Sequence, residues 1–264
     1  MVRALLTVFA GFVASGASAA DPVVVGHRGL VKHAPEETHA NFAACIDLRV
    51  HIELDVRRTR DGQLVCLHDD TLNRTTDGAG KVAEFSLREV RLLDAGKKFD
   101  PAFAGERVPT LEEVFALVRD RKAPLTIAID LKVPDCETDV VKLAEKYGVL
   151  KQLVFIGITI EKPAVREKLL EANKNVACAA LCPAADKLGD ALADKTCSWV
   201  YVRFIPTADE VKRIHAAGKK VFLVGPLVMG NEPENWAKGR AAGVDAILTD
   251  YPLECRAGWR GEKK

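Results

Sequence analysis

The feature of this sequence that most constrains its fold is the regular alternation of short apolar runs with helical patterns. Eight runs rich in β-branched and aromatic residues occur at 23–26, 50–56, 125–131, 153–158, 176–181, 199–204, 220–225 and 245–248. Segments with helical periodicity separate most of them, at 37–48, 110–121, 137–147, 162–171, 207–217 and 233–242. Strands that alternate with helices in this way predict a closed parallel (β/α)8 barrel, or TIM barrel.

An open doubly wound sheet is the chief alternative to the barrel. It is less favoured, because no glycine-rich dinucleotide fingerprint follows the first apolar run. One domain is predicted over 20–264, with a subregion at about 69–109 inserted after the second strand. An insertion between a strand and its helix falls at the carboxyl end of the barrel, where such barrels keep their functional sites.

Short-range geometry places a histidine beside two acids. On a strand over 51–56, alternation puts Glu53 and Asp55 on one face. Too few residues follow for a parallel crossover, whereas Asp61-Gly62 is a favourable two-residue hairpin turn. With that turn, His68 faces Asp55. A second histidine, His27, follows the first apolar run directly.

A third acid, Asp130, ends the strand predicted over 125–131. A single aspartate at a strand end is often only a turn or cap residue. Three carboxylates brought together repel one another unless a cation neutralises them, and an all-oxygen site suits a hard ion. Glu53, Asp55 and Asp130 are therefore predicted to hold one divalent cation, Ca²⁺ or Mg²⁺.

Arg28 and Lys132 lie beside these acids and complete a positively charged well that suits a phosphate group. His27 and His68 can act as an acid/base pair, in which one imidazole protonates a leaving alkoxide and the other activates the attacking oxygen. The predicted reaction is phosphodiester hydrolysis. Of the other histidines, His51 is predicted to be a hydrogen-bonded core residue, and surface or loop positions are expected for the rest: His33, His39 and His215.

Charge and the amino terminus bear on partners and location. The chain has 38 basic and 37 acidic residues, a balance that argues against a general binder of nucleic acid or other polyanions. Residues 1–19 resemble a cleavable export signal, which predicts a secreted or periplasmic protein without stable membrane insertion. Some of the seven cysteines could then pair, with Cys178 and Cys182 read as disulfide or core residues and Cys45 and Cys66 as buried ones.

Eight segments together resemble the glycerophosphodiester phosphodiesterase family. They are His27-Arg28-Gly29, Ala34-Pro35-Glu36-Glu37-Thr38, Glu53-Leu54-Asp55-Val56, Thr59-Arg60-Asp61-Gly62, His68-Asp69, Arg74-Thr75-Thr76, Val108-Pro109-Thr110-Leu111-Glu112-Glu113 and Gly243-Val244-Asp245-Ala246-Ile247-Leu248-Thr249-Asp250. The resemblance implies a TIM barrel with the same roles for the two histidines, the three acids and the two phosphate contacts. It further implies a small-molecule glycerophosphodiester substrate, split into glycerol 3-phosphate and an alcohol.

The chain departs from the family pattern at three places. Asp130 stands where glutamate is usual, and Glu37 stands where asparagine is usual. The seventh strand of the family commonly ends in Trp-Thr-Val-Asn, on the glycerol side of the pocket, whereas residues 222–226 read Phe-Leu-Val-Gly-Pro. Two alternative functions stay open: a phospholipase-D-like or cyclising phosphodiesterase in a related barrel, and, because of the altered seventh strand, a phosphodiester-binding protein without catalysis.

Overall fold

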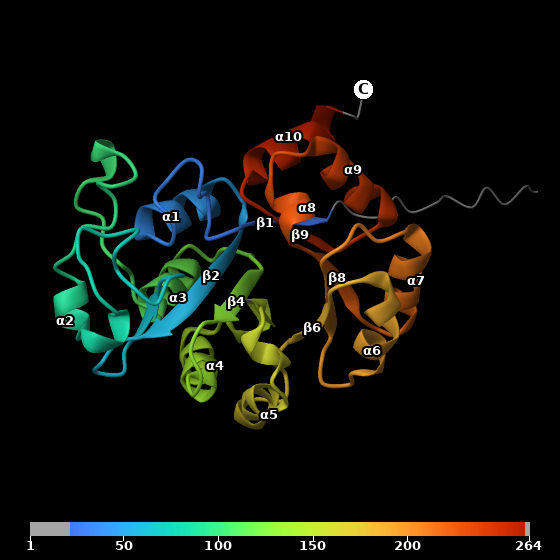
Figure 1. Cartoon of the computed structure of the whole chain (residues 1–264), viewed down its shortest axis with the longest axis horizontal. Coiled ribbons are helices and arrows are strands. Elements are labelled where there is room, and N and C mark those ends of the chain that lie inside the picture. Colours follow the sequence, from blue (N-terminus) through green and yellow to red (C-terminus); the bar gives the residue numbers. More distant parts are fainter. Residues whose placement is uncertain (1–21, 262–264) are drawn as a thin grey trace, which may run out of the picture.

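A computed structural model describes residues 22–261, and in it eight parallel strands alternate with helices around a barrel (Figure 1). The strands are β1 (Val23–Gly26), β2 (His51–Arg58), β3 (Leu64–Cys66), β4 (Ile127–Leu131), β5 (Leu153–Ile156), β6 (Ala179–Cys182), β7 (Trp199–Val202), β8 (Lys220–Leu223) and β9 (Ala246–Thr249). Their order is β5-β4-β2-β1-β9-β8-β7-β6, with β3 antiparallel on β2. The predicted TIM barrel is confirmed.

The barrel closes at a narrow seam between β5 and β6. The two strands share a single parallel bridge, Phe155 to Cys178, and the Phe155 amide donates to the Ala177 carbonyl at 2.8 Å. Every other neighbouring pair of parallel strands has a continuous register of at least two residues.

The helices form the outer layer. They are α1 (His39–Asp47), α2 (Leu87–Val90), α3 (Leu111–Asp120), α4 (Glu137–Tyr147), α5 (Pro163–Ala172), α6 (Leu188–Ala193), α7 (Ala208–Ala216), α8 (Pro226–Met229), α9 (Pro233–Ala242) and α10 (Pro252–Gly261). Capping boxes fix where three of them begin: Ser86 with Glu89 for α2, Thr110 with Glu113 for α3, and Thr207 with Glu210 for α7. Sequence periodicity predicted six of these helices and missed the short α2, α6 and α8 and the terminal α10.

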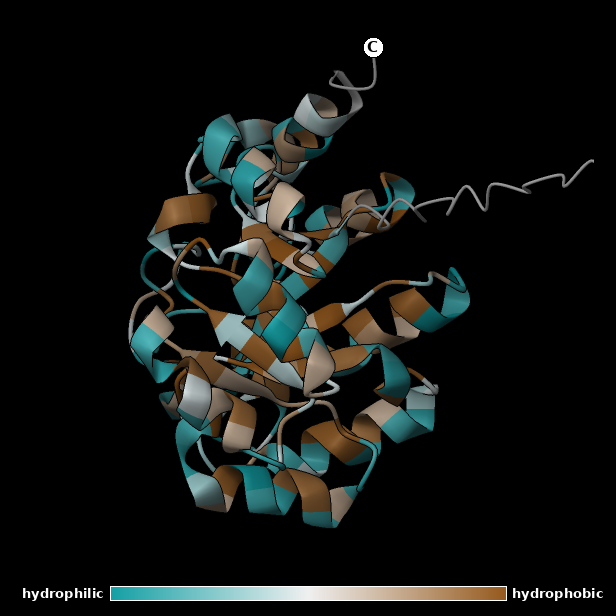
Figure 2. Ribbon diagram, turned by 90° about the vertical axis from the view of Figure 1, so that its right-hand side faces the viewer, coloured by the Kyte–Doolittle hydropathy of each residue, from teal (hydrophilic) through white to brown (hydrophobic). Residues whose placement is uncertain are grey.

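Alternation along the strands separates two apolar layers. Ile52, Leu54 and Val56 point outward into the core between sheet and helices, whereas Val25, Ala128 and Phe222 fill the barrel interior. In Figure 2 the central strands are largely brown, and the surrounding helices carry teal on their outer faces. The outward packing of the apolar residues of β2 leaves Glu53 and Asp55 on its inner face, as predicted.

The hairpin after β2 forms, but its predicted register is wrong by one residue. Arg57 faces Val65, whereas a two-residue Asp61-Gly62 turn would pair it with Cys66. The turn instead contains three residues, 60–62, with Gly62 in the left-handed conformation at φ +83°. The Leu67 amide donates to the Asp55 carbonyl at 3.0 Å, so Leu67 lies opposite Asp55 and His68 lies in the loop beyond β3.

The segment between β3 and α3 has a small apolar core of its own, formed by residues such as Leu72, Val82, Val90 and Val108. It lies to one side of the barrel, around α2 in Figure 1. A bridge from Val65 to Thr110 ties its end back to β3. The segment therefore holds the loop that carries His68 against the barrel.

Residues 1–21, which include the predicted export signal, lie outside the described residues. Within 22–261, none of the helices combines the length and apolar character needed to cross a bilayer. All seven cysteines are buried and have free thiols, so the structure contains no disulfide among them. Cys45 and Cys66 are buried core residues as predicted, and Cys178 and Cys182 are core residues as well.

Candidate active site

Three carboxylates meet at the carboxyl ends of β2 and β4. Glu53 and Asp55 come from β2 and Asp130 from β4, where Asp55 and Asp130 are register partners. One oxygen from each lies within 4.8 Å of the others. We call these three residues the acid cluster. The convergence predicted from sequence is thus observed.

Burial makes the acid cluster unfavourable without a cation. Glu53 is 2% exposed and Asp55 is 1% exposed. Burial, with the neighbouring charges of Asp55 and Asp130, raises the pKa of Glu53 well above its usual range. Burial also raises the pKa of Asp130, although Lys132 opposes that shift. Asp55 Oδ2 is a buried oxygen without a hydrogen-bond partner among the described residues. An all-carboxylate set with an unsatisfied oxygen fits a hard divalent cation.

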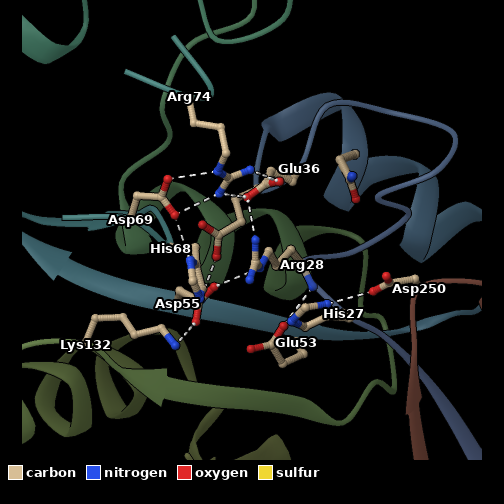
Figure 3. Close-up of polar contacts among 12 residues, drawn as sticks. His27, Arg28, Glu36, Glu53, Asp55, His68, Asp69, Arg74, Lys132 and Asp250 are labelled. Atoms are coloured by element: carbon tan, nitrogen blue, oxygen red, sulfur yellow. Dashed lines mark hydrogen bonds and ion pairs between the residues drawn. The ribbon is translucent and has the colours of Figure 1, made fainter. Parts of the chain in front are cut away.

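Two cationic side chains approach the acid cluster. The Lys132 ammonium lies 2.6 Å from Asp130 Oδ2 and 2.9 Å from Asp55 Oδ1. Arg28 lies on the other side, with Nε 3.5 Å from Asp55 Oδ2, and its backbone amide donates to Glu53 Oε2 at 2.7 Å. Arg28 has a left-handed backbone, φ +53°, which aims that amide at the acid. Both predicted phosphate contacts therefore border the predicted cation site (Figure 3).

His27 follows β1, and its position is fixed from the other end of the chain. Its backbone amide donates to the Thr249 carbonyl at 3.0 Å, and its Nδ1 lies 2.7 Å from Asp250 Oδ1. A carboxylate at Nδ1 favours the tautomer with a proton on that nitrogen, which leaves Nε2 free for proton transfer. Figure 3 shows His27 beside Glu53.

His68 is held in an equivalent way from the loop after β3. Its Nδ1 lies 2.8 Å from Asp69 Oδ1, and Arg57 donates to its carbonyl oxygen from Nε at 2.9 Å and from Nη2 at 2.6 Å. Figure 3 places His68 beside Asp55, on the opposite side of the acid cluster from His27. A positive charge on His68 would lower the pKa of Asp130 and so favour its carboxylate form. The two predicted histidines therefore flank the acid cluster despite the changed register.

A further ion-pair network supports His68. Arg74 binds Asp69 through Nε at 2.8 Å and Glu36 through Nη1 at 2.6 Å, and Arg28 reaches Glu36 at 3.1 Å. Burial alone would raise the pKa of Glu36, but the hydrogen bond from Arg74 and the charges of both arginines lower it. The network joins the loop after β1 to the inserted segment, so it couples the positions of Arg28 and His68.

Glu37 contacts the acid cluster through the backbone of Asp55. Its Oε1 accepts a hydrogen bond from the Asp55 amide at 2.6 Å, whereas its buried Oε2 has no hydrogen-bond partner among the described residues. It is 3% exposed, and burial together with Asp55 and Glu53 raises its pKa well above the usual range. Its φ of +55° explains why asparagine suits this position, because asparagine tolerates left-handed backbone. A protonated Glu37 supplies the neutral acceptor that an amide would supply.

Replacing Glu37 with glutamine is expected to raise the Tm of the metal-free protein at pH 7 by about 3 °C or more. A carboxyl with a raised pKa in the folded state costs stability as the pH rises above its ordinary value of 4.5, and glutamine removes that cost. The gain should therefore vanish below that pH, where glutamate is protonated in both folded and unfolded states. Thermal unfolding across pH tests this, with the exposed Glu167→Gln as control; an equal gain at every pH would contradict it.

The acid cluster opens into a cavity of about 150 Å³ at the mouth of the barrel. We call it the mouth cavity. Its lining includes the acid cluster, His27 and Lys132 on one side. The other side is formed by residues of the later strands and of the segments that follow them: Leu181, Tyr201, Arg203, Gly225, Met229 and Leu248. Burial and the charges of Glu53 and Asp130 raise the pKa of Tyr201 above its ordinary value.

Sequence reasoning assigned no roles to several of these residues. Asp250, Asp69, Glu36 and Arg74 lie in the segments that resemble the family, which was the available signal for them, and only Asp69 is next to one of the two histidines in the sequence. His33, His39 and His215 are exposed, as predicted. His51 accepts a 2.7 Å hydrogen bond from the Thr126 amide, as predicted, but it is half-buried and lies outside the core.

Fold and site together define a (β/α)8-barrel phosphodiesterase, and comparison with known proteins gives the family. The model of the Glycerophosphoryl diester phosphodiesterase family matches residues 27–254. A glycerophosphodiester phosphodiesterase from Caldanaerobacter subterraneus subsp. tengcongensis is 34% identical over 237 residues, which cover 87% of this chain and 94% of that protein. The chain belongs to the glycerophosphodiester phosphodiesterase family.

Solved structures agree with this assignment. A glycerophosphodiester phosphodiesterase from Agrobacterium tumefaciens superposes with a TM-score of 0.75 at 27% identity, covering 89% of this chain and 99% of that one. An Oleispira antarctica phosphodiesterase in complex with the product sn-glycerol-3-phosphate gives 0.73 at 26% identity, covering 91% and 97%.

Proposed function

We propose that this enzyme hydrolyses glycerophosphodiesters with one bound Ca²⁺ or Mg²⁺ and with His27 and His68 as acid and base. The observation that carries the proposal is the acid cluster, with its carboxylate oxygens within 4.8 Å, flanked by two histidines that each pair with an aspartate. The product named for the Oleispira relative supports glycerol 3-phosphate as the product here.

Glu53, Asp55 and Asp130 would hold the cation, which would supply positive charge beside the phosphate oxygens. Arg28 and Lys132 bind and orient the phosphate from two sides of the acid cluster. One imidazole removes a proton from water as its oxygen bonds to phosphorus, and the other donates a proton to the alkoxide as its P–O bond breaks. The products are glycerol 3-phosphate and the free alcohol.

Incubation of the protein with glycerophosphocholine or glycerophosphoethanolamine, with Ca²⁺ and Mg²⁺ in turn, tests the proposal. Release of glycerol 3-phosphate should stop with a chelator and return when the ion is restored. Phosphorus NMR distinguishes this monoester from a cyclic ester, which would indicate the cyclising alternative. Binding of the substrate with metal present but no turnover would contradict hydrolysis and indicate a binding protein.

Lys132 is expected to affect cation binding and turnover in opposite directions. Its ammonium competes with a divalent cation for Asp55 and Asp130, at 2.9 Å and 2.6 Å. Lys132→Gln should therefore bind Ca²⁺ about ten-fold more tightly but lose about ten-fold or more in kcat/KM, because a phosphate contact is removed. Calorimetric Ca²⁺ titration and assay test this, with the exposed Lys142→Gln as control; weaker Ca²⁺ binding by Lys132→Gln would contradict it.

Export to the periplasm or the medium remains part of the proposal and is supported by the pattern of residues 1–19 alone. The test is amino-terminal sequencing of the protein recovered outside the cytoplasm, where a new terminus after Ala19 is expected. An intact Met1 in that fraction would contradict cleavage.

A further inference from the structure

The mouth cavity contains an arginine that the proposed reaction does not use. Arg203 directly follows β7 and lines the cavity. Its side chain is exposed and makes no hydrogen bond or ion pair with any residue in 22–261. By contrast, Arg28 and Lys132, on the opposite side, are both paired with carboxylates. Arg203 is therefore a cation available to a ligand.

The barrel places this arginine across the mouth from the cation site. In the strand order, β7 lies four strands from β2 in either direction around the barrel. Tyr201 and Arg203 are two residues apart and share the inward face of β7, and the Tyr201 ring packs against Phe222 of the barrel interior with centroids 5.9 Å apart. A ligand with its phosphate at the acid cluster would reach Arg203 only with its far end.

The atypical end of β8 makes room for the guanidinium. Gly225 has φ +95° and ψ −176°, a conformation that only glycine adopts readily. A Cβ at this position would lie 3.3 Å from Arg203 Nε. The chain then enters α8 at once, and Met229 at the end of α8 also lines the mouth cavity. Any side chain at this position would crowd the arginine.

We propose that Arg203 binds an anionic group, a carboxylate or a phosphoryl group, on the part of the substrate that stays attached to the phosphate. The inference rests on the proposed function and deepens it: the preferred substrates are those glycerophosphodiesters whose retained three-carbon unit carries a second anionic group, so that their monoester product is a charged relative of glycerol 3-phosphate. The planar guanidinium is suited to paired oxygens of such groups. The reacting phosphate already has its cationic partners at the other wall, so a full charge at β7 matches a second anion better than a neutral hydroxyl.

Equilibrium binding of three phosphomonoesters, with Ca²⁺ in excess of the ligand, tests this by calorimetry. The ligands are glycerol 3-phosphate, 3-phosphoglycerate and glycerol 1,3-bisphosphate, which differ in the group at the far end. At least one of the two ligands with a second anion should bind about ten-fold or more tightly than glycerol 3-phosphate. Which one does so identifies the group as carboxylate or phosphoryl.

Arg203→Gln should bind all three ligands with similar affinity, and Arg203→Lys should keep part of the preference because it keeps the charge. Arg213→Gln, which removes an exposed arginine from α7 outside the cavity, should keep the whole preference. Thermal unfolding checks that each variant is folded. Equal or tighter binding of glycerol 3-phosphate by the unaltered protein, or a preference that survives in Arg203→Gln, would overturn the inference.

The calorimetric test measures binding and does not require turnover. The proposed role of Arg203 and the proposed hydrolysis can therefore be contradicted independently of each other. Hydrolysis of glycerophosphocholine without any preference among the three monoesters would overturn the role of Arg203 and leave the reaction intact. A clear preference that depends on Arg203, in a protein that hydrolyses no phosphodiester, would support the anion site and overturn the reaction.

Discussion

Replacing His27 or His68 with alanine is expected to lower kcat for glycerophosphodiester hydrolysis by about 10²–10⁴-fold, the range that general acid or base catalysis contributes. Each imidazole is positioned by a carboxylate at Nδ1, Asp250 at 2.7 Å for His27 and Asp69 at 2.8 Å for His68. Both rings therefore present Nε2 for proton transfer. KM should change less than kcat, because the phosphate is bound by other groups. Steady-state release of glycerol 3-phosphate measures both constants.

The pH dependence of kcat/KM assigns the two roles. The unaltered enzyme should show a bell-shaped profile, and each alanine variant should lose one limb of it. The lost limb tells which histidine is the base and which is the acid. His39→Ala, at an exposed position at the start of α1, should retain full activity. Full turnover by His68→Ala would refute its assignment as acid or base.

Sequence periodicity predicted the barrel because its strands obey a local rule. Alternation on β2 sends Ile52 and Leu54 outward and leaves Glu53 inward, and this follows from strand geometry alone. The parallel pairing of β2 with β4 then brings Asp130 beside Asp55 without any further information. The acid cluster was predictable for this reason.

The partners of the histidines were not predictable from local pattern. His27 and Asp250 are 223 residues apart, so their 2.7 Å contact depends on barrel closure next to β9. The predicted register of the hairpin was wrong for a different reason. An Asp-Gly pair is compatible with a two-residue turn and with a three-residue turn, and the sequence does not distinguish them. His68 still reaches the site because Arg57 binds its carbonyl oxygen, a contact that no spacing rule contains.

Glu37 and Gly225 show how a departure from a family pattern acquires a physical meaning only with the structure. Burial and the charges of Asp55 and Glu53 raise the pKa of Glu37, which disfavours the negative charge that glutamate would add in place of asparagine. Gly225 removes a side chain where Arg203 needs space, so the altered strand end changes the far side of the mouth cavity and leaves the acid cluster untouched. The first departure preserves the site, and the second one changes what the site can bind.

Glu53→Gln is expected to have opposite effects on stability with and without a divalent cation. Without metal, the variant should be at least as stable as the unaltered protein at pH 7, because burial and the charges of Asp55 and Asp130 raise the pKa of Glu53 and make its ionised form costly. With millimolar Ca²⁺ or Mg²⁺, the unaltered protein should gain Tm through binding to the folded state, whereas the variant should gain little.

The loss of one of three anionic ligands should weaken cation affinity by about 10²-fold or more and abolish measurable turnover. Calorimetric titration gives the affinity, and thermal unfolding with and without the ion gives a readout that is independent of activity. Glu167→Gln removes an exposed carboxylate on α5 and should leave both measurements unchanged. Because Glu53 Oε2 also accepts the 2.7 Å hydrogen bond from the Arg28 amide, which a glutamine oxygen can equally accept, the isosteric change isolates charge from geometry. An undiminished cation-induced rise in Tm in Glu53→Gln would contradict a role for Glu53 as a ligand, even if turnover were lost.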